Sequence, residues 1–136
     1  MNHVLFPNGS SEKISWIIQT GDSFVEQTRE HVEIYKNKIT DLQSKYVALH
    51  IGLFWGIGVF IIKNGDSLKI KIDEKPMFDH LNGSEKTNDE FIQNRIRFIN
   101  QLISQRRLKI QFELINQEVN PMKKTSNAKE LKTKNN

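Results

Sequence analysis

The sequence predicts an α/β protein with a mixed five-stranded sheet, helices on both faces and the element order β-β-β-α-β-α-α-β. Three observations indicate this class: short apolar or alternating segments at the start, one long apolar helix in the middle, and helices that alternate with strands after it. Helices that alternate with strands after an opening meander imply that the sheet is mixed and that helices cover both of its faces. A chain of 136 residues suits one domain with its own core.

The opening meander is expected from three segments. HVLF, residues 3–6, predicts a strand that runs into a loop at PNGSS. ISWIIQ and SFVEQTREHVEIY follow, on either side of Gly21 and Asp22. Because a two-residue link of this kind is typical of a β-hairpin, we expect these two segments to pair with each other.

The least polar stretch of the chain is KYVALHIGLFWGIGVFIIKNGD, residues 45–66. A membrane span needs about 20 apolar residues, whereas the apolar run here covers only residues 47–62 and contains His50. Ordinary strands are much shorter than this run. A buried helix is therefore the better interpretation, and a membrane is not expected as a partner.

The ends of this central helix have their own signals. Thr40 and Gln43 have the spacing of a capping box, in which the side chain of each residue accepts a hydrogen bond from the backbone N–H of the other. Gly65 follows the apolar run and suits the left-handed residue that closes a helix. We predict a helix over about residues 41–63.

Four elements are expected after the central helix. SLKIKID alternates apolar and charged residues, as a strand with one buried face does. EKPMFDHLNG predicts a short helix with Asp73 as its cap, Pro76 in its first turn and Gly83 at its end. Residues 88–106 have the apolar stripe of an amphipathic helix, and LKIQFELI, residues 108–115, predicts the last strand.

The positive charge lies at the end of the chain. Residues 121–136 hold five lysines and one glutamate, a net of 5 − 1 = +4, which equals the net charge of the whole chain. We therefore expect a neutral domain over 1–120 and a flexible basic tail over 121–136. The tail is either simply solvated or binds the phosphates of a nucleic acid. The chain contains no cysteine and opens without a secretory signal pattern, so the expected location is the cytoplasm.

Several strings, in this order along the chain, resemble the type 1 ribonuclease H fold from His3 to about Asn120. KYVALHIGL is similar to the start of that family's central helix, and LKIKIDEKPMFDHLNG has the layout of its fourth strand and short helix. LFPNGSS resembles the end of its first strand, and FINQLISQRRLKIQFELINQEVN its final helix, strand and loop. The helix string matches at five positions: Tyr46, Ala48, Leu49, Gly52 and Leu53.

The resemblance implies a site. Active members of that family cleave the RNA strand of an RNA–DNA hybrid with two divalent ions held by carboxylates. On their pattern of four acids, the first falls on Asn8, the second on Lys45 and the last near Lys124, and only Asp73 remains acidic. We expect the Lys45 ammonium to lie beside Asp73, with no metal bound. Read without the resemblance, Lys45 is a solvent-facing residue, Asp73 a helix cap and Asn8 a turn residue.

The resemblance thus implies a ribonuclease H-like domain without metal-dependent catalysis that binds nucleic acid, either an RNA–DNA hybrid or RNA. Candidate phosphate contacts are two arginines before the last strand and two lysines of the tail: Arg106, Arg107, Lys123 and Lys124. For the arginines, a favourable interaction with the helix dipole is the simpler interpretation. No cofactor is expected, and the four histidines lack the spacing of metal ligands.

Three alternatives stay open at this point. An active nuclease would need Mg²⁺ and a shifted acidic site that recruits Asp66, Glu74 or Asp79. A protein-interaction module with no nucleic-acid role is favoured by the neutral body of the chain. A small membrane-anchored protein is the third, and it depends on the apolar run of residues 45–66.

Overall fold

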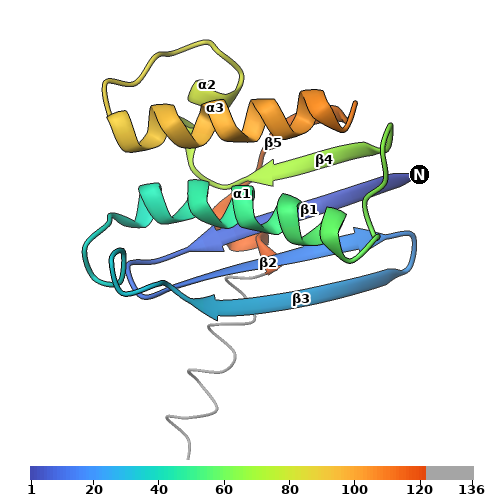
Figure 1. Ribbon diagram of the computed structural model, residues 1–136, viewed down its shortest axis with the longest axis horizontal. Coiled ribbons are helices and arrows are strands. Elements are labelled where there is room, and N and C mark those ends of the chain that lie inside the picture. Colours follow the sequence, from blue (N-terminus) through green and yellow to red (C-terminus); the bar gives the residue numbers. More distant parts are fainter. Residues whose placement is uncertain (122–136) are drawn as a thin grey trace, which may run out of the picture.

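The computed structural model describes residues 1–121 and confirms the predicted element order. Five strands form one sheet in the order β3-β2-β1-β4-β5 (Figure 1). The pairs β1–β2 and β2–β3 are antiparallel, whereas β1–β4 and β4–β5 are parallel, so the sheet is mixed as expected. The strands are β1 Asn2–Gly9, β2 Lys13–Thr20, β3 Ser23–Glu30, β4 Ser67–Ile72 and β5 Lys109–Leu114.

The meander follows the predicted hairpin but has a longer first strand. Thr20 pairs with Ser23 across the two-residue turn, where Gly21 has a φ of 59°. β1 continues past the predicted residues 3–6 to Gly9. Pro7 is tolerated inside this strand because the pairing of β1 with β4 ends at Leu5, so the missing N–H of Pro7 costs no bond on that side.

The helix α1, Asp41–Gly58, begins as predicted. The Thr40 side chain accepts from the backbone N–H of Gln43 at 3.0 Å, and the Gln43 side chain accepts from the backbone N–H of Thr40 at 2.9 Å. This capping box fixes the first turn of α1 and therefore the direction in which the residues after it point.

The other end of α1 differs from the prediction, because the helix stops at Gly58 rather than near residue 63. Phe60 takes the left-handed conformation with a φ of 66°, while Gly65, with a φ of 84°, lies in the loop before β4. The early stop lets Ile62 turn back and bury itself against Gly56, where a Cβ atom would lie only 2.7 Å from the Ile62 Cδ1. Burial of one isoleucine thus decides where the helix ends.

Two further helices follow, α2 Lys75–Leu81 and α3 Glu90–Gln105. The cap of α3 is Asp89, whose side chain accepts from the backbone N–H of Ile92 at 3.2 Å. The predicted cap of α2 was wrong: Glu74, not Asp73, holds the N-cap position, and no side chain caps it. The reason is that the Asp73 carboxylate is bound elsewhere, as described below.

α1 packs on the sheet over β1 and β2, α3 packs against α1, and α2 contacts β4 and β5 (Figure 1). Residues of all three helices join one core, and within residues 1–121 no helix is seen on the other face of the sheet. Leu5, Trp16 and Ile70 point from the strands into a single core that also contains residues of every helix. Gly52 brings α1 close to β2, since a Cβ atom there would lie 3.1 Å from Trp16 Cγ. No helix in this part of the chain combines the length and apolar character that a membrane crossing requires.

Candidate functional site at the carboxyl ends of β1 and β4

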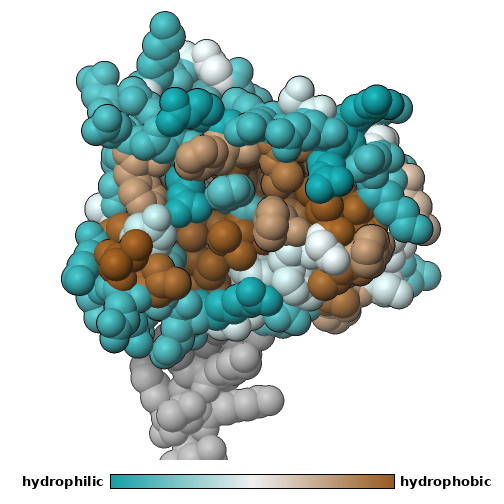
Figure 2. All heavy atoms as spheres, viewed as in Figure 1, coloured by the Kyte–Doolittle hydropathy of each residue, from teal (hydrophilic) through white to brown (hydrophobic). Residues whose placement is uncertain are grey.

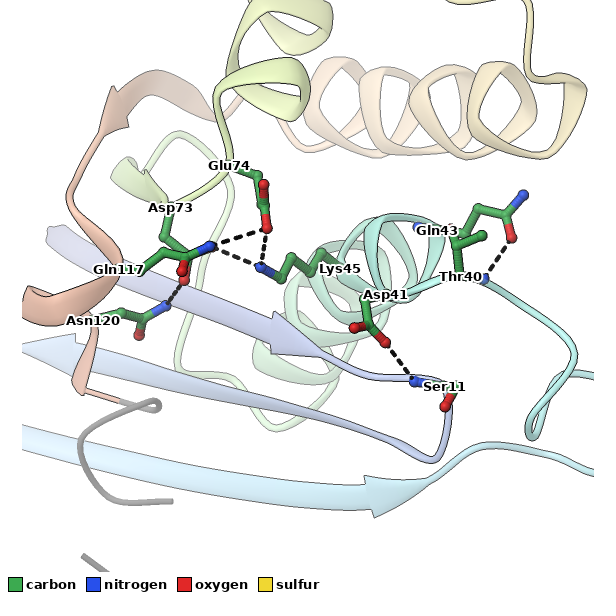
Figure 3. Close-up of polar contacts among 9 residues, drawn as sticks. All are labelled: Ser11, Thr40, Asp41, Gln43, Lys45, Asp73, Glu74, Gln117 and Asn120. Atoms are coloured by element: carbon green, nitrogen blue, oxygen red, sulfur yellow. Dashed lines mark hydrogen bonds and ion pairs between the residues drawn. The ribbon is translucent and has the colours of Figure 1, made fainter. Parts of the chain in front are cut away.

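Lys45 lies between two carboxylates at the end of β4. Its Nζ donates to Asp73 Oδ1 at 3.2 Å and to Glu74 Oε1 at 2.9 Å (Figure 3). The side chains of Lys45 and Asp73 are only 9% and 2% exposed, whereas that of Glu74 is 32% exposed. The expected approach of Lys45 to Asp73 is confirmed, and Glu74 joins them.

Two amides after β5 complete this cluster. Asn120 Nδ2 donates to Asp73 Oδ2 at 2.7 Å, and Gln117 Nε2 donates to Glu74 Oε1 at 3.2 Å (Figure 3). Asn120 is fully buried. Both oxygens of Asp73 therefore accept a hydrogen bond, one from an ammonium and one from an amide, which is the usual way in which a buried carboxylate is stabilised.

The start of α1 is held against the turn that follows β1, and this places Lys45. Gly9 allows the contact, because a Cβ atom there would lie 2.4 Å from Ser44 Oγ and 2.8 Å from the Ser44 backbone. The backbone N–H of Ser11 donates to Asp41 Oδ1 at 3.1 Å (Figure 3). These contacts fix the first turn of α1 over the carboxyl ends of the strands.

His31 supports the same junction from the end of the meander. Its Nε2 lies 2.7 Å from Ser44 Oγ and 3.0 Å from the backbone oxygen of Ser10. Burial lowers the pKa of His31, and the nearby Arg95 guanidinium lowers it further, against a raising effect of the Ser10 hydrogen bond. The neutral imidazole is thus favoured, and it bridges helix and turn without adding charge to the site.

Asn8, the first of the degenerate positions, lies in β1 next to Gly9. The hydrogen-bonded pairs of β1 and β4 run from Asn2–Ser67 to Leu5–Ile70. The same register carried three residues further places Asn8 opposite Asp73. Asn8 therefore belongs to the same end of the sheet by position, although the hydrogen bonds described above do not include it. Lys124, the fourth position, lies outside the described residues.

The residues at this site do not fit a pair of divalent ions. Such ions need several carboxylate oxygens with free lone pairs, but here an ammonium lies within 3.2 Å of both carboxylates and amides bind them too. Within residues 1–121, no group of three or more His, Asp or Glu side chains could hold a metal ion. The arrangement can tie α1, β4 and the segment after β5 together electrostatically.

The other predicted residues lie elsewhere. Arg106 and Arg107 precede β5, whose first residue pairs with the first residue of β4, so they lie at the opposite end of the sheet from Asp73. Among the alternative acids, Asp66 is also at that opposite end and Asp79 forms an exposed pair with Lys75. Only Glu74 joins the site. Lys123 and Lys124 fall outside the residues that the structure describes.

Glu74 was foreseen only as a substitute ligand, and Gln117 and Asn120 were not singled out as site residues at all. The signal that could have found Glu74 is its position directly after Asp73 at a strand end. Asn120 gives no local signal, because it is 47 residues away from its partner in the sequence. Such contacts are decided by chain topology.

Comparisons with known proteins agree with this architecture. A family model described as "Reverse transcriptase-like" matches residues 15–127. RNase H1 from Halobacterium salinarum is 16% identical, with a TM-score of 0.73 over 88% of this chain and 89% of that one. The N-terminal RNase H domain of rv2228c from Mycobacterium tuberculosis is 17% identical, with a TM-score of 0.72 over 88% and 91%.

A third solved structure is LC11-RNase H1 in complex with an RNA/DNA hybrid, 15% identical, with a TM-score of 0.70 over 88% of this chain and 89% of that one. Likeness at such low identity shows the fold alone. No curated protein matches the sequence. Since the family model covers most of its length, the chain belongs to the reverse transcriptase-like family and has the type 1 ribonuclease H fold.

Proposed function

We propose that this chain is a ribonuclease H-like module that binds an RNA–DNA hybrid or RNA and does not cleave it by two-metal hydrolysis. The observation that carries the proposal is the Lys45 ammonium, ion-paired with both Asp73 and Glu74. In two-metal hydrolysis the divalent ions stabilise the attacking and leaving oxygens. A lysine ammonium can neutralise carboxylate charge, but it is no Lewis acid and does not activate a water molecule.

The charge of the cluster supports the same conclusion. One ammonium and two carboxylates leave a formal charge of −1, and both carboxylates already accept hydrogen bonds. A divalent ion would have to approach a cation that has little freedom to leave, because the Lys45 side chain is only 9% exposed. Repulsion between the two cations in this poorly solvated environment opposes metal binding.

Binding of nucleic acid is supported by the fold and by charge. LC11-RNase H1, which has the same fold, has been solved with an RNA/DNA hybrid. In this chain the positive charge is concentrated in residues 121–136, as calculated from the sequence. If this tail contacts phosphates, binding releases counterions and weakens steeply with added salt.

A cleavage assay tests the loss of catalysis. We expect no turnover of a labelled RNA–DNA hybrid by the pure protein with Mg²⁺ or Mn²⁺. Isothermal titration with Mn²⁺ should show no stoichiometric site in the wild type, and Lys45→Glu, which brings a third carboxylate to Asp73 and Glu74, should acquire one. Lys75→Glu, on the surface, is the matched control and should acquire none. Metal-dependent cleavage by the wild type would overturn the proposal.

A binding assay tests the retained function. Fluorescence anisotropy with a labelled hybrid should show binding that weakens strongly as salt is raised, and truncation after Asn120 should abolish it. Circular dichroism of the truncated chain separates loss of binding from loss of folding. Absence of binding by the folded, full-length protein at low salt would contradict this part.

Exposed apolar side chains favour a second candidate, a protein-interaction module. Phe54, Phe60 and Phe98 are 63%, 78% and 44% exposed. Apolar surface gathers around α1 in the view of Figure 2, and exposed aromatic residues are enriched in protein interfaces. Binding of a protein partner that is insensitive to salt and weakened by Phe60→Ser, together with no affinity for nucleic acid, would favour this candidate over the first.

A further inference from the structure

The outer edge of β3 has no partner strand among residues 1–121. β3 lies at one end of the sheet order and pairs only with β2 (Figure 1). It is eight residues long, and every residue in it is exposed except Gln27, which is half-buried. An edge of this length presents a row of free N–H and C=O groups that can pair with another strand.

The hairpin geometry decides which groups are free. In a two-residue hairpin the pair next to the turn is hydrogen-bonded, and such pairs alternate along an antiparallel ladder. Thr20–Ser23 is that pair, so alternate residues from Ser23 onward bond to β2. The residues between them direct their N–H and C=O groups away from the sheet: Phe24, Glu26, Thr28 and Glu30.

We propose that a second copy of this chain pairs with this edge, with the two β3 strands antiparallel about a two-fold axis at Gln27. Phe24 of one copy then lies opposite Glu30 of the other, and Glu26 lies opposite Thr28. Val25 and Arg29 face each other in the same way. The two five-stranded sheets become one continuous sheet, with the helices of both copies on the same face.

The charges on β3 select this register. A two-fold axis at Glu26 would place that carboxylate opposite its own copy, and an axis at Thr28 would place Glu26 opposite Glu30. Like charges directly opposite each other on neighbouring strands are destabilising. A shift of one β3 strand along the other by a single residue is excluded as well. It would place residues whose backbone N–H and C=O groups already bond to β2 opposite residues whose groups point outward. The axis at Gln27 places no like charges opposite each other and pairs residues 24–30, more of β3 than an axis nearer either end of the strand would.

Apolar residues at the two ends of β3 complement each other in this register. One end carries Phe24 and Val25, which are 68% and 38% exposed and border a shallow pocket of about 220 Å³. Just beyond the other end lie Val32 and Ile34, which are 60% and 70% exposed. Because the copies run antiparallel, Val32 of one approaches the Phe24 end of the other.

Cysteine crosslinking tests the register directly, since the chain contains no cysteine of its own. In Gln27→Cys the two thiols meet across the axis as a non-hydrogen-bonded pair, where Cα atoms are about 4.5 Å apart, a separation that a disulfide can span. We expect this variant to form a covalent dimer under mild oxidation. Asp22→Cys, at the exposed hairpin turn, faces Val32 of the other copy and should not crosslink to itself.

Sedimentation tests association without a crosslink. The wild type should shift from monomer to dimer as concentration rises, and Thr28→Pro should remain monomeric, because proline removes an outward N–H and blocks the edge. Thr28 does not use its N–H toward β2, so the thermal melt of the variant should stay cooperative. A wild type that stays monomeric at every concentration, with Gln27→Cys no more crosslinked than Asp22→Cys, would overturn the proposal.

Discussion

Two buried carboxylates lie at opposite ends of the parallel pair β1–β4, and they are held in different ways. At the amino end, Asp66 accepts from the Met1 ammonium at 3.1 Å, from His3 Nε2 at 2.8 Å and from the Lys63 backbone N–H at 2.9 Å. Burial raises the pKa of Asp66, but these hydrogen bonds outweigh it and hold the pKa well below its ordinary value.

At the carboxyl end, Asp73 has one ammonium and one amide as donors, from Lys45 and Asn120. Those donors come from α1 and from the segment after β5. The amino-end cluster draws on the start of the chain and the loop before β4. The comparison shows that both ends tie distant segments to the same strand pair, but a side-chain ammonium bound to two carboxylates is found at the carboxyl end, whereas the amino end uses a terminal ammonium, a histidine and a backbone N–H.

Removal of Lys45 should give the largest loss of stability among the variants proposed for the two ends. Lys45→Met leaves Asp73 buried without its cation, which costs about 3–5 kcal/mol in the free energy of unfolding. Urea denaturation measures the loss. Lys75→Met, at the exposed pair with Asp79, is the control and should unfold like the wild type. If both variants unfold at the same urea concentration, the ion pairs of Lys45 with Asp73 and Glu74 contribute nothing to the free energy of unfolding.

Substitution of the carboxylate at the amino end should cause a smaller loss of stability, and this loss should depend on pH. Asp66→Asn weakens hydrogen bonds to a charged acceptor and should cost about 1.5–3 kcal/mol near neutral pH. A lowered folded-state pKa stabilises the fold above the ordinary pKa of 3.8, and this contribution disappears as pH falls through the folded value. The difference in melting temperature between wild type and variant should therefore become smaller as the pH falls below the ordinary pKa. A gap independent of pH would contradict the assignment.

Substitution of one glycine at each end should give the smallest losses of stability. The two positions separate steric overlap, at Gly9, from backbone strain at positive φ, at Gly65. Gly9→Ala creates overlap with the Ser44 backbone and should cost about 1–3 kcal/mol. Gly65→Ala meets no neighbour within 4 Å but must keep a φ of 84°, which costs about 1 kcal/mol. Gly58→Ala, within α1 and without neighbours, should not destabilise the fold. Equal losses at Gly9 and Gly58 in chemical denaturation would argue against the close approach of α1 to the end of β1.

Periodicity and capping predicted the elements well where the signal is local. The capping box of Thr40 and Gln43 and the Gly21-Asp22 hairpin are where the pattern placed them. The end of α1 could not be predicted, because it depends on Ile62 packing against Gly56. The apolar run continues beyond the helix, and nothing in it separates helical residues from those that turn back into the core.

The sequence by itself determined the type and order of the elements and, through the family resemblance, the pairing of Lys45 with Asp73. Only the tertiary structure decided that Glu74 joins them, that Asn120 supplies the second donor and that Arg106 lies at the far end of the sheet. The physical reason is range: helix and strand patterns arise from neighbours a few residues apart, whereas a buried carboxylate takes its donors from whichever distant segments the topology brings within hydrogen-bond distance.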